Sequence, residues 1–476
     1  MKKFLSRYHP RYIRSLVYML QASEYSVRDY LHWLPRVENF RTVETRKNLV
    51  TTKKALLFLV GASVLLVISY AAALGSFFLF QSPLNALLSA IIVLAAPYIV
   101  AYGILIPLFL FNFFIQYPVT RFKIARAHEK LKKSKAIKIA IAGSYGKTSM
   151  REILRTVIGQ GKRVQSPEGS INTPLGICNF IEGLKGDEEV LIFEFGEYYP
   201  GDITELSHLV RPDIGIITGV NEAHLEKFRR IEATTKTIFE LAEYMGNKPL
   251  YVNRENENVR KAAAHFHILY DRNGVLNWKV EKRKSDLSGT SFDLVQEAVR
   301  ISVVSKLLGL HHIGPLVAAA DIGLRVGLSL ENITQGLNTT KAYDHRLEPI
   351  YDESGVITLD DSYNGNPDGA SAVIDFLASL SGHRRFYVTP GLVEMGVRKE
   401  AIHREIGRKL ALAQIEKVIL IRNSVTPYIE SGLQENKYRG EIIWYDTAHE
   451  AFSALPVLTA KGDVVLLQND WPDQYA

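Results

Sequence analysis

IAIAGSYGKTSM, residues 139–150, joins a short apolar run to a glycine turn and then to the start of a helical pattern. A buried strand, a glycine turn and a helix N-terminus in this order place backbone N–H groups and the helix dipole around a phosphate. Gly143 and Gly146 let the backbone approach such a ligand. Lys147 is placed to reach the β- and γ-phosphates, and the Thr148 hydroxyl is placed to ligate Mg²⁺.

Strand-like and helix-like patterns alternate on both sides of this turn. Short runs rich in Val, Ile and aromatic residues recur, separated by stretches of helical periodicity, which predicts parallel sheets covered by helices. We expect an α/β protein with a phosphate-loop ATPase domain at 137–341 and a Rossmann-like domain at 342–476. The strand-like runs lie at 137–142, 190–195, 214–219, 249–252, 356–360, 385–390, 417–422, 441–445 and 464–468.

Two polar residues lie at the ends of such buried-type runs. Glu194 closes one of them, and His224 follows another. The carboxyl ends of parallel strands form the crevice in which α/β proteins bind ligands. We therefore expect Glu194, His224 and Thr148 to converge on Mg²⁺, although Glu194 in a salt bridge and His224 at a helix start are the simpler alternatives, and imidazole is an atypical Mg²⁺ ligand.

A long uncharged region precedes the soluble part of the chain. Residues 55–116 contain no Asp, Glu, Lys, Arg or His. The apolar runs at 55–80 and 84–115 each exceed the roughly 20 residues that cross a bilayer core as helix. They predict two transmembrane helices, with Pro97 and Pro107 kinking or tilting the second. A buried hairpin in a soluble protein is the alternative.

Charge is distributed unevenly along the chain. Residues 1–138 hold 20 Lys/Arg against 5 Asp/Glu, which leaves 37 against 45 in the remainder. The basic excess therefore belongs to the membrane segment, and a nucleic-acid partner is not expected. Basic flanks on both sides place both ends in the cytoplasm at the cell membrane. We expect a basic amphipathic segment at 1–54, on the membrane surface or in solution, and a basic juxtamembrane linker at 117–136.

The soluble part resembles a known family, the Mur ligases, which form amide bonds of peptidoglycan precursors. Their shortened phosphate loop, G-[ST]-x-G-K-T-[ST], matches GSYGKTS, which explains why Ile141 stands where the general pattern has a glycine. The resemblance covers roughly residues 137–468, and DDSYNGNPD at 360–368 is similar to the branch that adds D-alanyl-D-alanine, the MurF type. The other similar stretches are SINTPLGI, FEFGEYYPGDI, RPDIGIITGVNEAHLEKF, GLHHIGPLVAAA, HRLEP and GLVEMG.

The resemblance implies roles for individual residues. Lys236 corresponds to a lysine that the family carbamylates into a ligand for a second Mg²⁺, although an exposed helix lysine is an alternative. Arg346 would reach the phosphates and Asp361 the ribose. Residues implied for the triphosphate are Gly143, Ser144, Tyr145, Gly146, Lys147, Thr148 and Ser149; those implied for substrates are Asn172, Thr173, Tyr363, Asn364 and Asn366, the last two being good turn residues as well.

Three departures from the family pattern bear on its substrates. The family's UDP-binding N-terminal domain has no recognisable counterpart in residues 1–136. His312 and Pro315 stand where the family usually has Asn, which affects the adenine contact. The ending LLQNDWPDQYA, residues 466–476, replaces a Lys-Gly-Ser-Arg-like ending.

The sequence therefore favours a membrane-anchored ligase that uses ATP and Mg²⁺ and works through an acyl phosphate. Its expected partners are the bilayer, a nucleotide- or lipid-linked peptidoglycan precursor, and an amino acid or dipeptide. One alternative is a related membrane ligase that makes another polymer, such as poly-γ-glutamate. A nucleotide-binding membrane protein without ligase chemistry is another, and the oligomeric state stays open.

Overall fold

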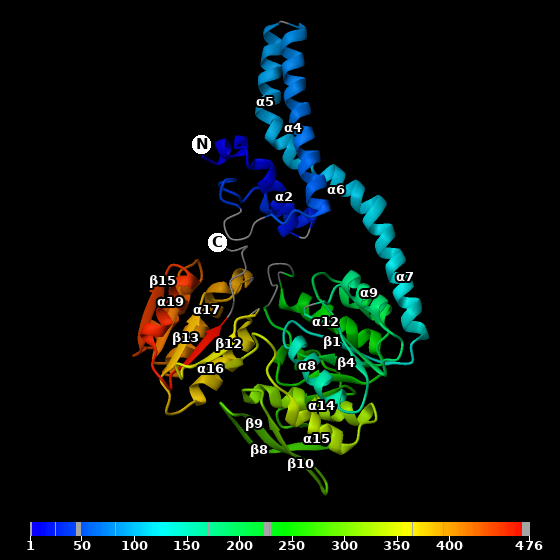
Figure 1. Ribbon diagram of the computed structural model, residues 1–476, viewed down its shortest axis with the longest axis vertical. Coiled ribbons are helices and arrows are strands. Elements are labelled where there is room, and N and C mark those ends of the chain that lie inside the picture. The colour runs from blue at the N-terminus through cyan, green and yellow to red at the C-terminus, as the bar shows by residue number, and fades with distance from the viewer. Residues whose placement is uncertain are drawn as a thin grey trace. The chain divides into compact units, whose positions relative to one another are not determined.

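The computed structural model describes residues 2–23, 25–43, 49–80, 82–169, 171–222, 228, 230–363, 365–393 and 395–468. The described chain forms two compact units, one ending at Phe122 and one beginning at Lys123. The first consists of helices, and the second of sheets covered by helices (Figure 1).

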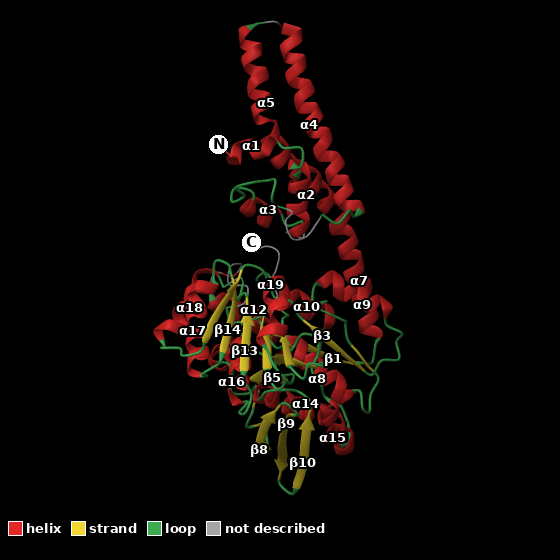
Figure 2. Cartoon of the chain, turned by 60° about the vertical axis from the view of Figure 1, so that its left-hand side comes forward, coloured by secondary structure: helices red, strands yellow, loops and turns green. Residues whose placement is uncertain are grey.

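Two long antiparallel helices, α4 (Lys53–Phe80) and α5 (Pro83–Gly103), dominate the N-terminal unit (Figure 2). The stretches Lys53–Phe78 and Pro83–Lys133 are long and apolar enough to cross a membrane, and only 22% and 33% of their apolar windows is buried in the structure. The two apolar runs are therefore helical and largely exposed, while their insertion in a bilayer stays a prediction.

Shorter helices pack against the base of this pair. The Tyr12 hydroxyl of α2 (Tyr12–Ala22) donates to the Pro97 carbonyl at 3.0 Å, and the Tyr30 hydroxyl of α3 (Val27–Trp33) donates to the Ala101 carbonyl at 2.8 Å. Apolar residues of α2 and α3 thus join a core with α4 and α5, while contact of this segment with a membrane surface stays a prediction. A short helix and a 3₁₀ turn precede them, α1 (Lys2–Leu5) and η1 (Ser6–Tyr8).

The second apolar stretch is interrupted and then continues as helix. Pro107 cannot donate an N–H to the Gly103 carbonyl and its ring clashes with that carbonyl, which is where α5 ends. The predicted linker at 117–136 is for the most part a helix, and its residues Ala127 and Leu131 are buried in the C-terminal unit. The segments are α6 (Leu105–Phe111), the π-helical turn η2 (Asn112–Gln116) and α7 (Tyr117–Lys133).

The first sheet of the C-terminal unit has the order β10-β9-β8-β7-β6-β5-β4-β1-β3-β2. Its strands β1 to β6 pair in parallel, as the alternating pattern predicts. They are β1 (Ile137–Ala142), β2 (Val164–Gln165), β3 (Val190–Glu194), β4 (Ile214–Ile217), β5 (Leu250–Asn253) and β6 (Ile268–Asp271).

The central strand β1 shows how the sequence builds two helical layers. Ile139 and Ile141 pack in one layer, while the smaller Ala140 and Ala142 pack in the other. The first layer contains α8 (Lys147–Ile158), α14 (Ile313–Arg325) and α15 (Leu330–Thr339). The second contains α9 (Pro174–Gly183), α10 (Asp202–Val210), α12 (Ile231–Met245) and part of α13 (Glu257–Ala262), and the turn η3 (Leu310–His312) precedes α14.

Antiparallel strands that the sequence analysis did not foresee extend this sheet. They are β7 (Gly274–Val275), β8 (Trp278–Asp286), β9 (Gly289–Gln296) and β10 (Val299–Ser305). β8 has mostly exposed or half-exposed charged residues such as Lys279, Glu281 and Lys284. A strand with a charged, solvated face lacks the continuous apolar run of a buried parallel strand, so it was missed.

The second sheet has the order β11-β12-β16-β13-β14-β15, with all neighbours parallel except β11 and β12. Its strands are β11 (Glu348–Tyr351), β12 (Ile357–Asp361), β13 (Arg385–Thr389), β14 (Lys417–Ile421), β15 (Glu441–Tyr445) and β16 (Val464–Gln468). One face packs on α16 (Pro367–Ser379), α17 (Lys399–Leu412) and α18 (Thr426–Glu435), and the other on α19 (Ala448–Leu458). The turn η4 (Gly396–Arg398) precedes α17.

Candidate nucleotide and metal site

The glycine turn between β1 and α8 has the backbone geometry of a phosphate-binding loop. Gly143 and Gly146 have φ angles of +147° and +75°, which only glycine adopts readily. At Gly143 a Cβ atom would lie 2.2 Å from the Thr218 hydroxyl oxygen, so no side chain fits there. The Ser144 N–H donates to the Gly219 carbonyl at 2.8 Å and holds the turn at the end of β4. The first N–H groups of α8 then lie open to an anion.

Lys147, the first residue of α8, forms a nearly dry ion pair. Its Nζ donates to the Gly143 carbonyl and lies 2.8 Å from Oε2 of Glu197, which follows β3. The side chains of Lys147 and Glu197 are 12% and 2% exposed. Their attraction is therefore stronger than that of a surface pair. Thr148 and Ser149 follow in the first turn of the helix.

Glu194, the last residue of β3, connects the loop helix to a buried arginine. Its Oε2 accepts a hydrogen bond from the Thr148 hydroxyl at 3.2 Å. Its Oε1 lies 2.9 Å from Nη1 of Arg151, as an ion pair without hydrogen-bond alignment. Burial raises the pKa of Glu194, against the lowering effect of Arg151, Lys147 and Thr148. The structure thus brings two of the predicted metal ligands, Thr148 and Glu194, together.

The donor atoms around Glu194 fit Mg²⁺, which prefers oxygen ligands. The Thr148 hydroxyl and Glu194 Oε2 supply two of them. Two more buried oxygens, Ser144 Oγ and Glu197 Oε1, have no hydrogen-bond partner among the described residues. His224, the third predicted ligand, lies outside the described residues.

Arg346, which precedes β11, is close enough to influence this carboxylate. Its guanidinium carbon lies 4.8 Å from the Tyr363 ring centroid. Burial lowers the pKa of Arg346, and the negative charges of Asp361 and Glu194 oppose that shift. Residues predicted to contact phosphate, ribose and metal therefore form one electrostatic group, drawn from both sheets.

Asp361 ends β12 within this group. Its Oδ1 accepts a hydrogen bond from the Leu347 N–H at 3.2 Å. Burial raises the pKa of Asp361 to about 7, while Arg346 and Gln468 lower it. The carboxyl group is therefore partly protonated at neutral pH.

We expect Asp361 to make the stability of the protein depend on pH. The folded protein keeps this proton up to about pH 7, whereas an unfolded Asp loses it near pH 3.9. The stabilisation present at low pH is lost as the pH rises through this window, by about 4 kcal/mol at most and less where water reaches the group. Asp361→Asn does not titrate, so its thermal midpoint should exceed that of the wild type by more at pH 8 than at pH 5. An equal difference at both values would contradict the shifted pKa.

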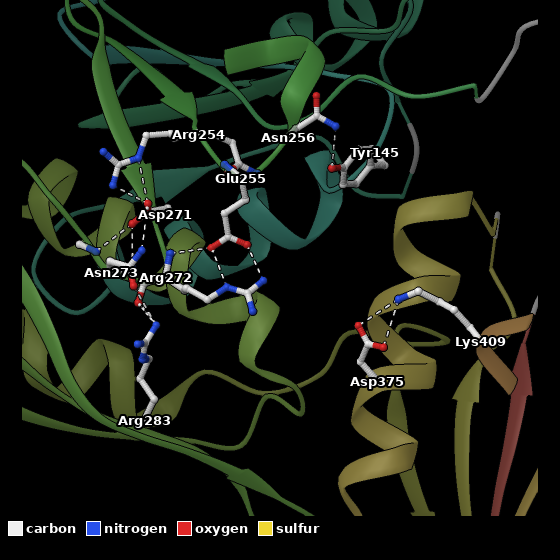
Figure 3. A network of polar contacts seen from close by, with 12 residues as sticks. Tyr145, Arg254, Glu255, Asn256, Asp271, Arg272, Asn273, Arg283, Asp375 and Lys409 are labelled. Carbon is white, nitrogen blue, oxygen red and sulfur yellow. Dashed lines mark hydrogen bonds and ion pairs between the residues drawn. The ribbon is translucent and has the colours of Figure 1, made fainter. Parts of the chain in front are cut away.

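Polar residues that follow β5 and β6 form a network beside the loop residue Tyr145 (Figure 3). The Asn256 amide donates to the Tyr145 hydroxyl at 3.2 Å, and Glu255 Oε2 lies 2.7 Å from Arg272 Nη2. Burial lowers the pKa of His311 to about 4, and the charge of Arg272 adds to this effect. His312, at a position where the resemblance expects Asn, is 7% exposed and belongs largely to the core.

Residues assigned to substrates by resemblance also have structural roles. The Thr173 hydroxyl caps α9, and the Asn366 carboxamide caps α16, each by accepting the N–H three residues on. Asn366 also accepts a hydrogen bond at 2.8 Å from Asn221, so this contact joins the domain of the first sheet to the domain of the second. The Asn172 carbonyl accepts the Gly196 N–H at 3.0 Å and so lies beside the end of β3. Asn364 lies outside the described residues.

Lys236 lies at the surface. It is exposed on α12 and lines a cavity of about 720 Å³ together with Asn258, Lys261 and Phe266. None of the contacts of Thr148 or Glu194 that the structure describes involves it. Its role as a modified metal ligand stays a prediction.

Two charged residues of the site were not predicted from the sequence: Glu197, the ionic partner of Lys147, and Arg151, the ionic partner of Glu194. Glu197 stands three residues after Glu194, beyond the end of a buried strand, and Arg151 stands one helical turn after Lys147 on α8. Two signals could have indicated these residues. One is a second carboxylate after a buried strand, and the other is a cation on the buried side of the helix that follows the loop.

Fold and loop together define a nucleotide-binding protein of the phosphate-loop class with a second α/β domain. Residues 141–323 match the Mur ligase middle domain, and residues 345–468 match the Mur ligase, glutamate ligase domain. These matches together span more than half of the chain. The chain belongs to the Mur ligase family, whose related members are ATP-dependent, ADP-forming ligases.

Similar proteins are UDP-N-acetylmuramoyl-tripeptide–D-alanyl-D-alanine ligases. The Bacillus subtilis enzyme is 24% identical over 69% of this chain and 72% of its own length, and the Escherichia coli enzyme is 26% identical over 60% and 64%. The chain thus spans roughly two thirds of these relatives. MurF from Acinetobacter baumannii has the same fold, with a TM-score of 0.65, 21% identity and coverage of 73% of this chain and 76% of its own. MurF from Thermotoga maritima in complex with ADP has a TM-score of 0.65 and 23% identity, and the match covers 74% of this chain and 80% of that one.

Proposed function

We propose that this protein is a membrane-anchored ligase that adds D-alanyl-D-alanine to a peptidoglycan precursor peptide, with consumption of ATP. The observation that supports this most strongly is the phosphate loop, in which Lys147 and Thr148 face the buried carboxylates of Glu197 and Glu194. The similarity to D-alanyl-D-alanine ligases supports the choice of substrate.

The residues of the loop suit the activation of a carboxylate. An oxygen of the peptide carboxylate bonds to the γ-phosphorus as the bond to ADP breaks, which gives an acyl phosphate. The amine of the dipeptide then attacks the carbonyl carbon, phosphate leaves with the C–O bonding pair, and the amine proton passes to solvent. Lys147, Arg346 and the loop N–H groups orient the triphosphate and stabilise its charge. Mg²⁺ held by Thr148 and Glu194 would neutralise further negative charge.

Mass spectrometry of the products tests this function. Detergent-purified protein is incubated with ATP, Mg²⁺, D-alanyl-D-alanine and UDP-N-acetylmuramoyl-tripeptide, with Lys147→Ala as the blank. A pentapeptide product absent from the blank is the expected result. A product formed only with glutamate would favour a poly-γ-glutamate-type ligase, and nucleotide binding without any product would favour a protein without ligase chemistry.

We propose further that α4 and α5 cross the cell membrane and hold the enzyme beside its precursor. Their exposed apolar side chains support this proposal. The protein without residues 1–120 should then use a soluble UDP-linked precursor less efficiently. Unchanged efficiency would contradict a role of the anchor in substrate capture.

Cysteine labelling in intact cells tests the orientation of the hairpin. The native Cys178 is fully buried and burial raises the pKa of its thiol to about 11, so it should react little. We expect Leu84→Cys, 74% exposed near the hairpin tip, to react with a membrane-impermeant maleimide. Lys132→Cys on α7 should react only after the cells are lysed. Equal labelling of both positions in intact cells would exclude the proposed topology.

A further inference from the structure

Glu197 is a buried acidic residue beside the phosphate loop. The proposed reaction gives it no role, whereas Glu194 is assigned to Mg²⁺. Glu197 is 2% exposed. Its Oε2 lies 2.8 Å from Lys147 Nζ, and its Oε1 is buried without a hydrogen-bond partner among the described residues. Removing Lys147 from this ion pair would leave the cost of burying the carboxylate charge uncompensated.

Nucleotide binding makes a competing demand on Lys147. The lysine of a phosphate loop reaches the β- and γ-phosphates. Lys147 is now engaged by Glu197 and by the Gly143 carbonyl. If its ammonium group turns to a triphosphate, Glu197 loses its cation while it stays enclosed, and an unpaired buried carboxylate is unfavourable.

Among the described residues, the nearby buried cation Arg151 does not offer a replacement. Arg151, 1% exposed, is already engaged with Glu194, with Glu152 and with the Gly169 carbonyl. A divalent cation that accompanies the nucleotide could replace Lys147 as the partner of Glu197, because carboxylate oxygens are its preferred protein ligands. The lysine expected to provide a second carboxylate-like ligand, Lys236, is exposed on α12.

We propose that Glu197 exchanges Lys147 for a divalent cation when nucleotide binds, and so becomes a metal ligand in addition to Thr148 and Glu194. This inference rests on the proposed function, because it requires nucleotide at the loop. In the nucleotide-free protein the same carboxylate holds Lys147 in place.

Electron paramagnetic resonance of free Mn²⁺ tests the exchange without measuring turnover. The detergent-purified full chain is titrated with Mn²⁺ in the presence of a saturating non-hydrolysable ATP analogue. Glu197→Gln should weaken at least one Mn²⁺ site tenfold or more. Glu205→Gln, an exposed residue on α10, is the control and should titrate like the wild type. Equal Mn²⁺ titrations of Glu197→Gln and the wild type would overturn the proposal.

Two further measurements make the result unambiguous. Binding of the analogue in the presence of Mg²⁺ reports on the loop: a wild type that binds none contradicts the proposed function, and the exchange with it. In Lys147→Met, Glu197 has no lysine partner even without nucleotide. Mn²⁺ should therefore raise the thermal midpoint of Lys147→Met more than that of Lys147→Met with Glu197→Gln. Equal shifts would overturn the proposal even if Glu197→Gln alone failed to bind nucleotide.

Discussion

Lys147→Ala should lower the rate of ligation by about a thousandfold or more. The ammonium group is the loop's only side-chain cation for the β- and γ-phosphates, and removal of one such preorganised charge typically costs two to three orders of magnitude in rate. Its loss also leaves Glu197 buried without its partner, 2.8 Å away in the wild type. The measurement is the initial rate of product formation, followed by mass spectrometry under saturating ATP.

A second lysine variant separates this effect from a general loss of positive charge. Lys162 lies just after α8, and its ammonium group lies in a long, partly exposed ion pair of 3.6 Å with Glu189. Lys162→Ala should therefore retain nearly the wild-type rate. If Lys147→Ala kept more than a tenth of the wild-type rate, the loop would not be the site of phosphoryl transfer.

Arg151→Met should destabilise the C-terminal unit by about 3–5 kcal/mol, the usual cost of removing one partner of a buried ion pair. Arg151 is 1% exposed and its Nη1 lies 2.9 Å from Glu194 Oε1. The methionine fills much of the space but leaves the carboxylate without its cation. Thermal unfolding in detergent should show a midpoint lower by about 10 °C, since each kcal/mol shifts a domain of this size by about 2–4 °C.

A double variant tests the electrostatic cause. Arg151→Met with Glu194→Gln contains no unpaired charge, so it should regain most of the lost stability. Arg155→Met is the surface control, because Arg155 is 51% exposed and lies 3.6 Å from its partner Glu152. Its effect should stay below about 1 kcal/mol. If the double variant were as unstable as Arg151→Met, packing rather than charge would explain the loss.

Much of the site's location was predictable from the sequence, because strand ends carry local signals. Glu194 closes a run of five buried residues, where a carboxylate requires a cation or donor. The contact with Thr148 agrees with the expectation that these strand ends converge. The cap formed by Asn366 agrees with the alternative interpretation of this residue as part of the local structure.

The partners of those residues were not predictable in the same way. Glu197 and Lys147 are 50 positions apart in the sequence, so no local sequence pattern relates them. β8 to β10 escaped prediction because their charged residues interrupt the apolar runs used to find strands. Lys236 is exposed on α12, and its role as a modified metal ligand stays a prediction that rests on the resemblance.

The sequence by itself determined the alternation of buried strands with helices, the glycine loop, the two apolar helices and the carboxylate at the end of β3. These features depend on periodicity, on backbone freedom at glycine and on burial, which act between near neighbours. The tertiary structure alone decided that Glu197 pairs with Lys147, that Arg151 pairs with Glu194, and that Arg346 and Asp361 belong to the same electrostatic group. Such pairings depend on chain segments brought together by packing, because electrostatic attraction becomes strong only where folding has excluded water.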